Sequence, residues 1–185
     1  LMGLSAMGQT SRIGDIEFYP LQEPKPDRAL FGVLEVFENN IDQKGKTITL
    51  HIELLPAKAT KNKKAPMFIL MGGPGQASSD LISFFSNIFS EINKESDLVF
   101  IDQRGTGKSN PLQMLTSYNN TQDYFNDVLM VDEVVENTYR MLSAKNDLRN
   151  YGTLNAAIDL ESVRVAMGYN KINLYGTSYG TRLAM

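Results

Sequence analysis

The first strongly apolar part of the chain alternates in part with polar residues. Residues 29–37 (ALFGVLEVF) and 46–56 (KTITLHIELLP) are rich in β-branched and aromatic side chains, which suit a pleated, half-buried strand. The segment between them, residues 39–45, contains the Asn, Asp and Gly residues that favour turns. The pattern predicts two antiparallel strands joined as a hairpin.

Three later stretches are short and mostly apolar. They are residues 66–71 (PMFILM), 97–101 (DLVFI) and 171–175 (KINLY). A short strand that does not alternate is typically buried on both faces, as in a parallel sheet that helices cover. We therefore expect three buried strands after the hairpin.

Helical spacing separates these strands. Residues 77–93 predict an amphipathic helix, since apolar side chains recur at i, i+3 and i+4: Leu81, Phe84, Phe85, Ile88 and Ile92. Residues 120–148 are more polar, and a helix there would place four apolar residues inward: Val128, Val131, Val135 and Leu142.

A further helix is predicted between two capping residues. Thr153 is a suitable N-cap and Gly168 a suitable C-terminal stop. Its apolar face would consist of Ala157, Leu160, Val163 and Met167. Strand–helix–strand units after an antiparallel start predict an α/β fold with a mostly parallel sheet and right-handed crossovers.

Composition narrows the function classes. The 185 residues carry 42% hydrophobic and 21% charged residues with a net charge of −3, which suits one globular domain and offers no basic surface for nucleic acid. The basic run at residues 61–64 lies beside Pro66 and indicates a surface loop. The absence of cysteine excludes thiolate nucleophiles and cysteine-ligated metals. No apolar run reaches the roughly 18 residues of a membrane span.

The first residues, LMGLSAMGQTS, are uncharged and rich in small side chains. They resemble the tail of a signal peptide with its cleavage site near residues 5–9, but the cationic n-region is missing, so a plain chain terminus is the alternative. The stretch favours export to the periplasm or the exterior and leaves the cytoplasm open. We assign residues 1–28 to an N-terminal segment and residues 29–185 to the folded domain.

The loop at residues 102–109 (DQRGTGKS) ends like a phosphate-binding loop. That motif, G-x-x-x-x-G-K-[ST], needs a glycine at position 102, where this chain has aspartate. The carboxylate would repel phosphate and keep the backbone away from it. A nucleotide site is therefore disfavoured, and the loop needs another explanation.

A nucleophile motif follows the last predicted strand. Residues 176–180 (GTSYG) fit G-x-S-x-G and are followed by a segment compatible with a helix, which is the strand–turn–helix setting of a nucleophile elbow. Glycines two residues before and after Ser178 leave room for a strained turn that exposes the serine oxygen. Ser178 would attack a carbonyl carbon, and the backbone N–H of Tyr179 would face the oxyanion. The alternative is an ordinary Gly/Ser turn before a helix, without a catalytic role.

The glycine turn after the first apolar strand, residues 71–75 (MGGPG), could supply a second oxyanion donor. Glycines let the backbone approach a substrate closely, and Pro74 stiffens the turn. We select the N–H of Gly73 as the donor, with Gly72 as the next choice.

The three motifs GGPG, DQRGTGKS and YGTSYGTRLA, in this order, resemble the α/β-hydrolase fold, and specifically the prolyl aminopeptidase and tripeptidyl aminopeptidase-like serine peptidases. The resemblance covers residues 29–185 and extends to the hairpin and to residues 155–161 (NAAIDLE). It implies peptide substrates and no metal or cofactor. It also implies that the DQRG loop lies near the active-site face, where Asp102 and Arg104 would brace neighbouring loops or contact substrate.

The chain departs from the family pattern in two places. Met71 stands where prolyl aminopeptidases usually have a histidine, and Gln76 replaces a further glycine. These departures favour the tripeptidyl aminopeptidase-like branch and leave the specificity open.

None of the three motifs contains the general base that the serine would need. In α/β-hydrolases the acid and the histidine follow the serine in the chain, yet the single histidine, His51, precedes it and is expected to be structural or solvent-facing. We therefore interpret the chain as the N-terminal part of a larger enzyme, with a fold incomplete at its C-terminus and the base and acid beyond residue 185. An esterase of the same fold and a non-catalytic domain remain the alternatives.

Overall fold

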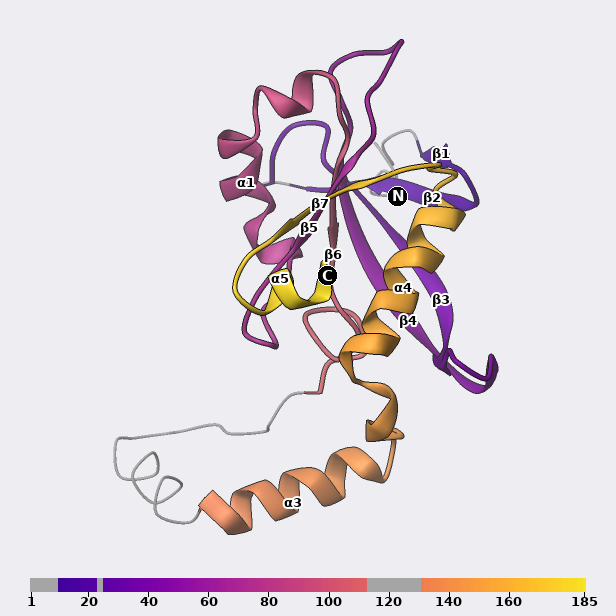
Figure 1. The fold of residues 1–185 in the computed structure, drawn as a ribbon, viewed down its shortest axis with the longest axis vertical. Helices are drawn as coiled ribbons and strands as arrows, with labels where there is room; N and C mark the ends of the chain where they lie inside the picture. The colour runs from indigo at the N-terminus through magenta and orange to yellow at the C-terminus, as the bar shows by residue number, and fades with distance from the viewer. Residues whose placement is uncertain (1–9, 23–24, 113–130) are drawn as a thin grey trace, which may run out of the picture.

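A seven-stranded sheet organises the molecule (Figure 1). The computed structural model describes residues 10–22, 25–112 and 131–185. Within these residues the strands lie in the order β1-β2-β3-β4-β6-β5-β7. The sheet is mixed: its first half is antiparallel and its second half is built on parallel pairs.

The antiparallel half contains the predicted hairpin. β1 (Ser11–Ile13) and β2 (Ile16–Pro20) precede β3 (Leu30–Asn39) and β4 (Lys44–Leu55). β3 and β4 pair from Leu30↔Leu54 to Asn39↔Lys44, with a register shift after Phe37. The two strands predicted from the alternating segments are confirmed.

The parallel half places three strand ends at one edge of the sheet. β5 (Met67–Leu70) runs parallel to both β6 (Leu98–Ile101) and β7 (Asn173–Gly176). The loops that follow these strands therefore emerge together, which is where open α/β sheets bind ligands.

The burial of these three strands differs from the prediction in one case. β6 is entirely buried and β5 nearly so, as expected. β7 is not buried, since it pairs with β5 on one side only within the described part of the chain, and Leu174 is 41% exposed.

Helices cover both faces of the sheet. On one face lies α1 (Ile82–Ile88), flanked by the short 3₁₀ turns Ser79–Leu81 and Ile92–Lys94. On the other lie α4 (Thr153–Ala166) and α5 (Tyr179–Leu183). α3 (Val131–Ser143) extends away from the sheet (Figure 1), and a 3₁₀ turn, Leu148–Asn150, leads on to α4.

Two hydrophobic clusters hold these layers together. One joins α4 and α5 to the sheet through Ala156, Leu160, Val163, Met167 and Leu183. The other joins α1 to the opposite face through Ile82 and Phe85. Apolar surface removed from water contributes about 25 cal/mol per Å² to stability, so these clusters fix how the helices lie on the sheet.

The inward faces of two helices differ from the prediction. In α1 the buried residues are Ile82 and Phe85, whereas Phe84 is 57% exposed and Ile88 also faces outward. A 3₁₀ turn before Ile82 changes the helical phase, which a single 3.6-residue period does not capture. In α3, Val135 is 54% exposed, so the expected inner stripe is wrong there.

The predicted C-terminal end of α4 is confirmed, whereas the predicted N-cap is not. Gly168, at φ 72°, ends the helix: its N–H donates to the Val165 carbonyl, and the Tyr169 N–H donates to the Arg164 carbonyl. These two hydrogen bonds form the Schellman motif, so the predicted end of the helix at Gly168 is confirmed. The N-cap is Gly152, not Thr153, whose hydroxyl instead bonds the phenol of Tyr179.

The remaining predictions concern the surface and the segments outside the described ranges. Residues 61–64 are exposed between β4 and β5, as expected, and Lys63 pairs with Asp97 at 3.0 Å. Among the described helices, none has the length and apolarity to cross a membrane. The signal-peptide interpretation of residues 1–9 and the Val128 position lie outside the described residues.

Candidate active site

Ser178 lies on a strained turn between strand and helix. β7 ends at Gly176 and α5 begins at Tyr179, so only two residues make the connection. Ser178 has φ 49° and ψ −119° and is exposed. Such backbone geometry costs a non-glycine residue about 1–3 kcal/mol and persists only where surrounding contacts hold it. The turn thus holds the serine oxygen out from the backbone, in the manner of a nucleophile elbow.

The flanking glycines are required by close backbone contacts. A Cβ on Gly176 would lie 2.5 Å from the Gly180 carbonyl oxygen. A Cβ on Gly180 would overlap the carbonyl oxygen of Leu70, the last residue of β5. The G-x-S-x-G spacing therefore matches a steric need of this turn, and the helix can begin directly against the neighbouring strand.

Gly180→Ser should be strongly destabilising, because the new side chain would overlap rigid backbone in β5. We expect the free energy of unfolding to fall by about 3 kcal/mol or more, measured as a lower urea midpoint. Gly152→Ser is the matched control: a Cβ there meets nothing within 4 Å, and serine is favoured at an N-cap. Equal midpoints for the two variants would contradict the assigned packing.

The glycine turn after β5 lies directly against Ser178. A Cβ on Gly72 would stand 2.9 Å from the Ser178 Cβ and 3.4 Å from its Oγ. The Thr177 N–H donates to the Leu70 carbonyl at 3.1 Å, which ties the elbow to the end of β5. Gly73, at φ 109°, continues the turn. Sequence order alone places the two motifs at neighbouring strand ends, and the structure brings them into contact.

Several backbone N–H groups of the elbow and the glycine turn have no acceptor among the residues described. Those of Gly73 and Tyr179, the predicted oxyanion donors, are among them. Donors that are already fixed and unpaired can stabilise a developing oxyanion without reorganisation. The Gly72 carbonyl accepts the N–H of Gln76 at 3.3 Å.

Gln103 also belongs to this site, although it was not singled out from the sequence. Its side-chain amide donates to the Met71 carbonyl at 3.2 Å, and it is buried. The loop after β6 thereby holds the first residue of the glycine turn. The only sequence signal for this contact is the position of Gln103 within the DQRG motif.

Asp102 links its own loop to the 3₁₀ turn that precedes α1. Its carboxylate accepts hydrogen bonds from the Ser79 N–H and hydroxyl, both at 2.9 Å, and from the Lys108 N–H at 3.0 Å. The residue is fully buried, and a side chain on Gly107 would overlap its carboxylate. This carboxylate fills the centre of the loop that resembles a phosphate-binding motif.

Arg104 is buried and points away from solvent. Its guanidinium pairs with both carboxylate oxygens of Asp159, at 2.6 and 2.7 Å, and donates to the carbonyls of Glu38 and Asn150 at 2.6 and 2.7 Å. It thereby joins the loop after β6 to the end of β3, to the 3₁₀ turn before α4 and to the middle of α4. The Tyr151 ring lies 5.9 Å from the guanidinium carbon, and burial, together with a hydrogen bond to Glu38, raises the Tyr151 pKa.

His51 is 6% exposed, so its expected solvent-facing position is wrong and the structural interpretation holds. Its Nε2 lies 3.3 Å from Glu53, and its ring stacks on Phe31 with centroids 6.0 Å apart. Burial alone would raise the pKa of Glu53, but hydrogen bonds with His51 and Lys25 outweigh it and lower that pKa. Nothing in the described ranges bonds the Ser178 hydroxyl as a base would.

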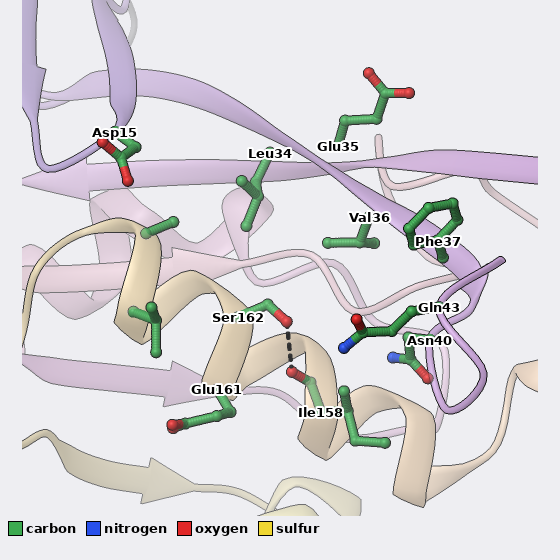
Figure 2. A pocket seen from close by; sticks show the side chains of 12 residues that line it. Asp15, Leu34, Glu35, Val36, Phe37, Asn40, Gln43, Ile158, Glu161 and Ser162 are labelled. Atoms are coloured by element: carbon green, nitrogen blue, oxygen red, sulfur yellow. Dashed lines mark hydrogen bonds between the residues drawn. The ribbon is translucent and has the colours of Figure 1, made fainter.

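A separate cavity of about 500 Å³ lies between β3 and α4 (Figure 2). Leu34 and Val36 line it from the strand, and Ile158 and Ser162 line it from the helix. No residue of the elbow or of the glycine turn borders it. The cavity is therefore separate from the elbow.

The chain is similar in sequence to known serine peptidases. It is 29% identical over 176 residues to serine protease Hip1 of Mycobacterium tuberculosis, a match that covers 85% of this chain and 32% of the protease. It is 27% identical over 153 residues to the tripeptidyl aminopeptidase of Streptomyces lividans, covering 75% of this chain and 28% of that enzyme. No family model matches the chain.

The proline iminopeptidase-related protein of Thermus thermophilus is a similar solved structure. It aligns with a TM-score of 0.47 at 16% identity, covering 82% of this chain and 38% of that protein. The chain spans about a third of the length of the curated relatives it matches. Its strand order, its elbow and its sequence relatives identify the α/β-hydrolase fold, and the chain is related to serine peptidases of that fold.

Proposed function

We propose that this chain carries the nucleophile and oxyanion hole of a serine peptidase. The observation that carries the proposal is the strained, exposed Ser178, in contact with the glycine turn after β5. Residues 29–185 would form the N-terminal part of the catalytic domain. The sequence similarity to a serine protease and to a tripeptidyl aminopeptidase supports the same assignment.

The chemistry follows from the arrangement of these groups. The Ser178 Oγ attacks the carbonyl carbon of a peptide bond while a base accepts its proton. The N–H groups of Tyr179 and Gly73 stabilise the oxyanion. The carbon–nitrogen bond then breaks, and the protonated amine leaves with the C-terminal fragment. Water hydrolyses the acyl-enzyme and releases the N-terminal fragment.

We propose that the base is an imidazole from outside these 185 residues. His51 is the only histidine in the sequence, and its ring is held against Glu53 and Phe31. Asp102 and Arg104 are bracing residues in this account, because their polar atoms already bind neighbouring loops.

The finer proposal is an aminopeptidase that releases single residues or short peptides from free N-termini. The similarity to a tripeptidyl aminopeptidase supports it. An esterase of the same fold is the alternative, because the elbow and oxyanion donors would serve an ester equally well.

Matched substrates separate these two activities in the natural protein that carries this chain. We expect a tripeptide anilide with a free N-terminus to be cleaved at least about 100-fold faster, in kcat/KM, than its N-acetylated form. An enzyme that pairs the substrate ammonium loses this interaction when the amine is blocked. Equal rates for both peptides, with fast hydrolysis of a simple acyl ester, would instead identify an esterase.

A further inference from the structure

The strained serine requires restraints on both sides of the turn. Before Ser178, the Thr177 N–H is bonded to the Leu70 carbonyl at 3.1 Å. After it, the Thr181 hydroxyl and N–H donate to the Ser178 carbonyl at 2.6 and 3.0 Å. These contacts hold the ends of the turn. The Ser178 carbonyl and the Tyr179 N–H, the proposed oxyanion donor, belong to one planar peptide unit, so the Thr181 contacts also orient that N–H. The Tyr179 Cα has a further restraint through its own side chain.

The Tyr179 side chain has a specific partner on another helix. Its phenol oxygen lies 2.7 Å from the Thr153 hydroxyl, and both residues are half-buried. Thr153 is the first residue of α4, and Tyr179 the first residue of α5. One hydrogen bond therefore ties the start of the elbow helix to the start of a longer helix.

The start of α4 is itself firmly held. Asn155 donates to the Asn40 side chain at 2.8 Å, and Asn40 donates back to the Asn155 carbonyl at 2.8 Å and to Asp159 at 2.9 Å. Asp159 is paired with Arg104 from the loop after β6. Buried, fully paired networks of this kind are rigid, so Thr153 is a fixed point from which Tyr179 can be oriented.

We propose that Thr153 is a positioning residue for the oxyanion hole. Its hydroxyl holds the Tyr179 phenol and so restrains the Tyr179 ring and Cα, in addition to the Thr181 contacts that orient the peptide unit between Ser178 and Tyr179. The inference rests on the proposed function, since it assigns Thr153 a role in the same acyl-transfer site. Thr153 does not touch the reacting atoms.

Thr153→Val keeps the volume of the side chain and removes the hydroxyl. We expect the maximal rate of Ser178 labelling by a fluorophosphonate to fall about tenfold, with little change in the probe concentration at half-maximal rate. Small misplacements of catalytic groups cost rate rather than binding. Thr153→Ser keeps the hydroxyl and should restore most of the parent rate.

Tyr179→Phe tests the same bond from its other end. It should cause a similar fall, and the Thr153→Val/Tyr179→Phe double variant should be no slower than either single variant, because both remove one interaction. Tyr169→Phe is the matched control. Its phenol donates to Asp97, which precedes β6 at the opposite end of the sheet, so we expect lower thermal stability with an unchanged labelling rate.

The outcomes separate this inference from the proposed function. A parent protein that is not labelled on Ser178 would contradict the proposed function and the inference together. A labelled parent with parent-like rates in Thr153→Val and Tyr179→Phe would contradict the positioning role alone. Fully additive losses in the double variant would contradict it as well, since the two residues would then act independently.

Discussion

Replacing Ser178 with alanine is expected to lower peptide turnover by about 10⁶-fold in the natural protein. Loss of the nucleophile removes the covalent pathway entirely, and only binding and oxyanion stabilisation remain. The substitution also removes a hydroxyl of an exposed residue, which makes no hydrogen bond among the described residues. Single-turnover kinetics should therefore show no burst of released amine, whereas the thermal midpoint should stay close to that of the parent.

Ser86→Ala is the control for this result. Ser86 is a partly exposed serine on α1 whose hydroxyl donates only to the Ser83 carbonyl at 2.8 Å. Its removal should leave the burst intact. A burst that survives in Ser178→Ala would show that another residue forms the acyl-enzyme and would contradict the assigned nucleophile.

Arg104→Met should cause the largest loss of stability of any single change in the loop after β6. It removes the cation that pairs with Asp159 and the donors to the Glu38 and Asn150 carbonyls, all at 2.7 Å or less. A buried carboxylate left without its partner costs about 3–5 kcal/mol. Urea unfolding should show this as a lower midpoint.

Two further variants distinguish this cause from general damage. Arg104→Met/Asp159→Leu should recover part of the loss, because it removes the unpaired charge as well as its partner. Arg149→Met should change stability little, since Arg149 pairs with Asp147 on the exposed surface. If Arg104→Met unfolds at the parent midpoint, Arg104 does not hold the loop after β6 to α4.

The features that could be predicted from the sequence are those with local causes. The hairpin was indicated by alternating β-branched residues around a turn. The elbow was indicated by glycines that its backbone contacts require. Gly168 ends α4 because only a residue that tolerates positive φ suits that position. Each signal lies within a few residues of the structure it causes.

The features that were missed depend on distant partners. Gln103 is bonded to Met71, and Thr153 to Tyr179, across 32 and 26 positions of sequence. The buried His51 ring stacks on Phe31 of the neighbouring strand β3. The outward turn of Phe84 results from a 3₁₀ turn that interrupts the helical period. Local patterns do not contain these contacts.

The most direct test of the account is the site of covalent modification in the natural protein that carries this chain. The protein would be treated with a fluorophosphonate, its intact mass measured, and the modified peptide sequenced. The account predicts a single adduct on Ser178, because only this serine lies on the strained elbow beside the glycine turn. No adduct, or an adduct on another serine, would contradict the assignment of this elbow as the nucleophile of a serine hydrolase.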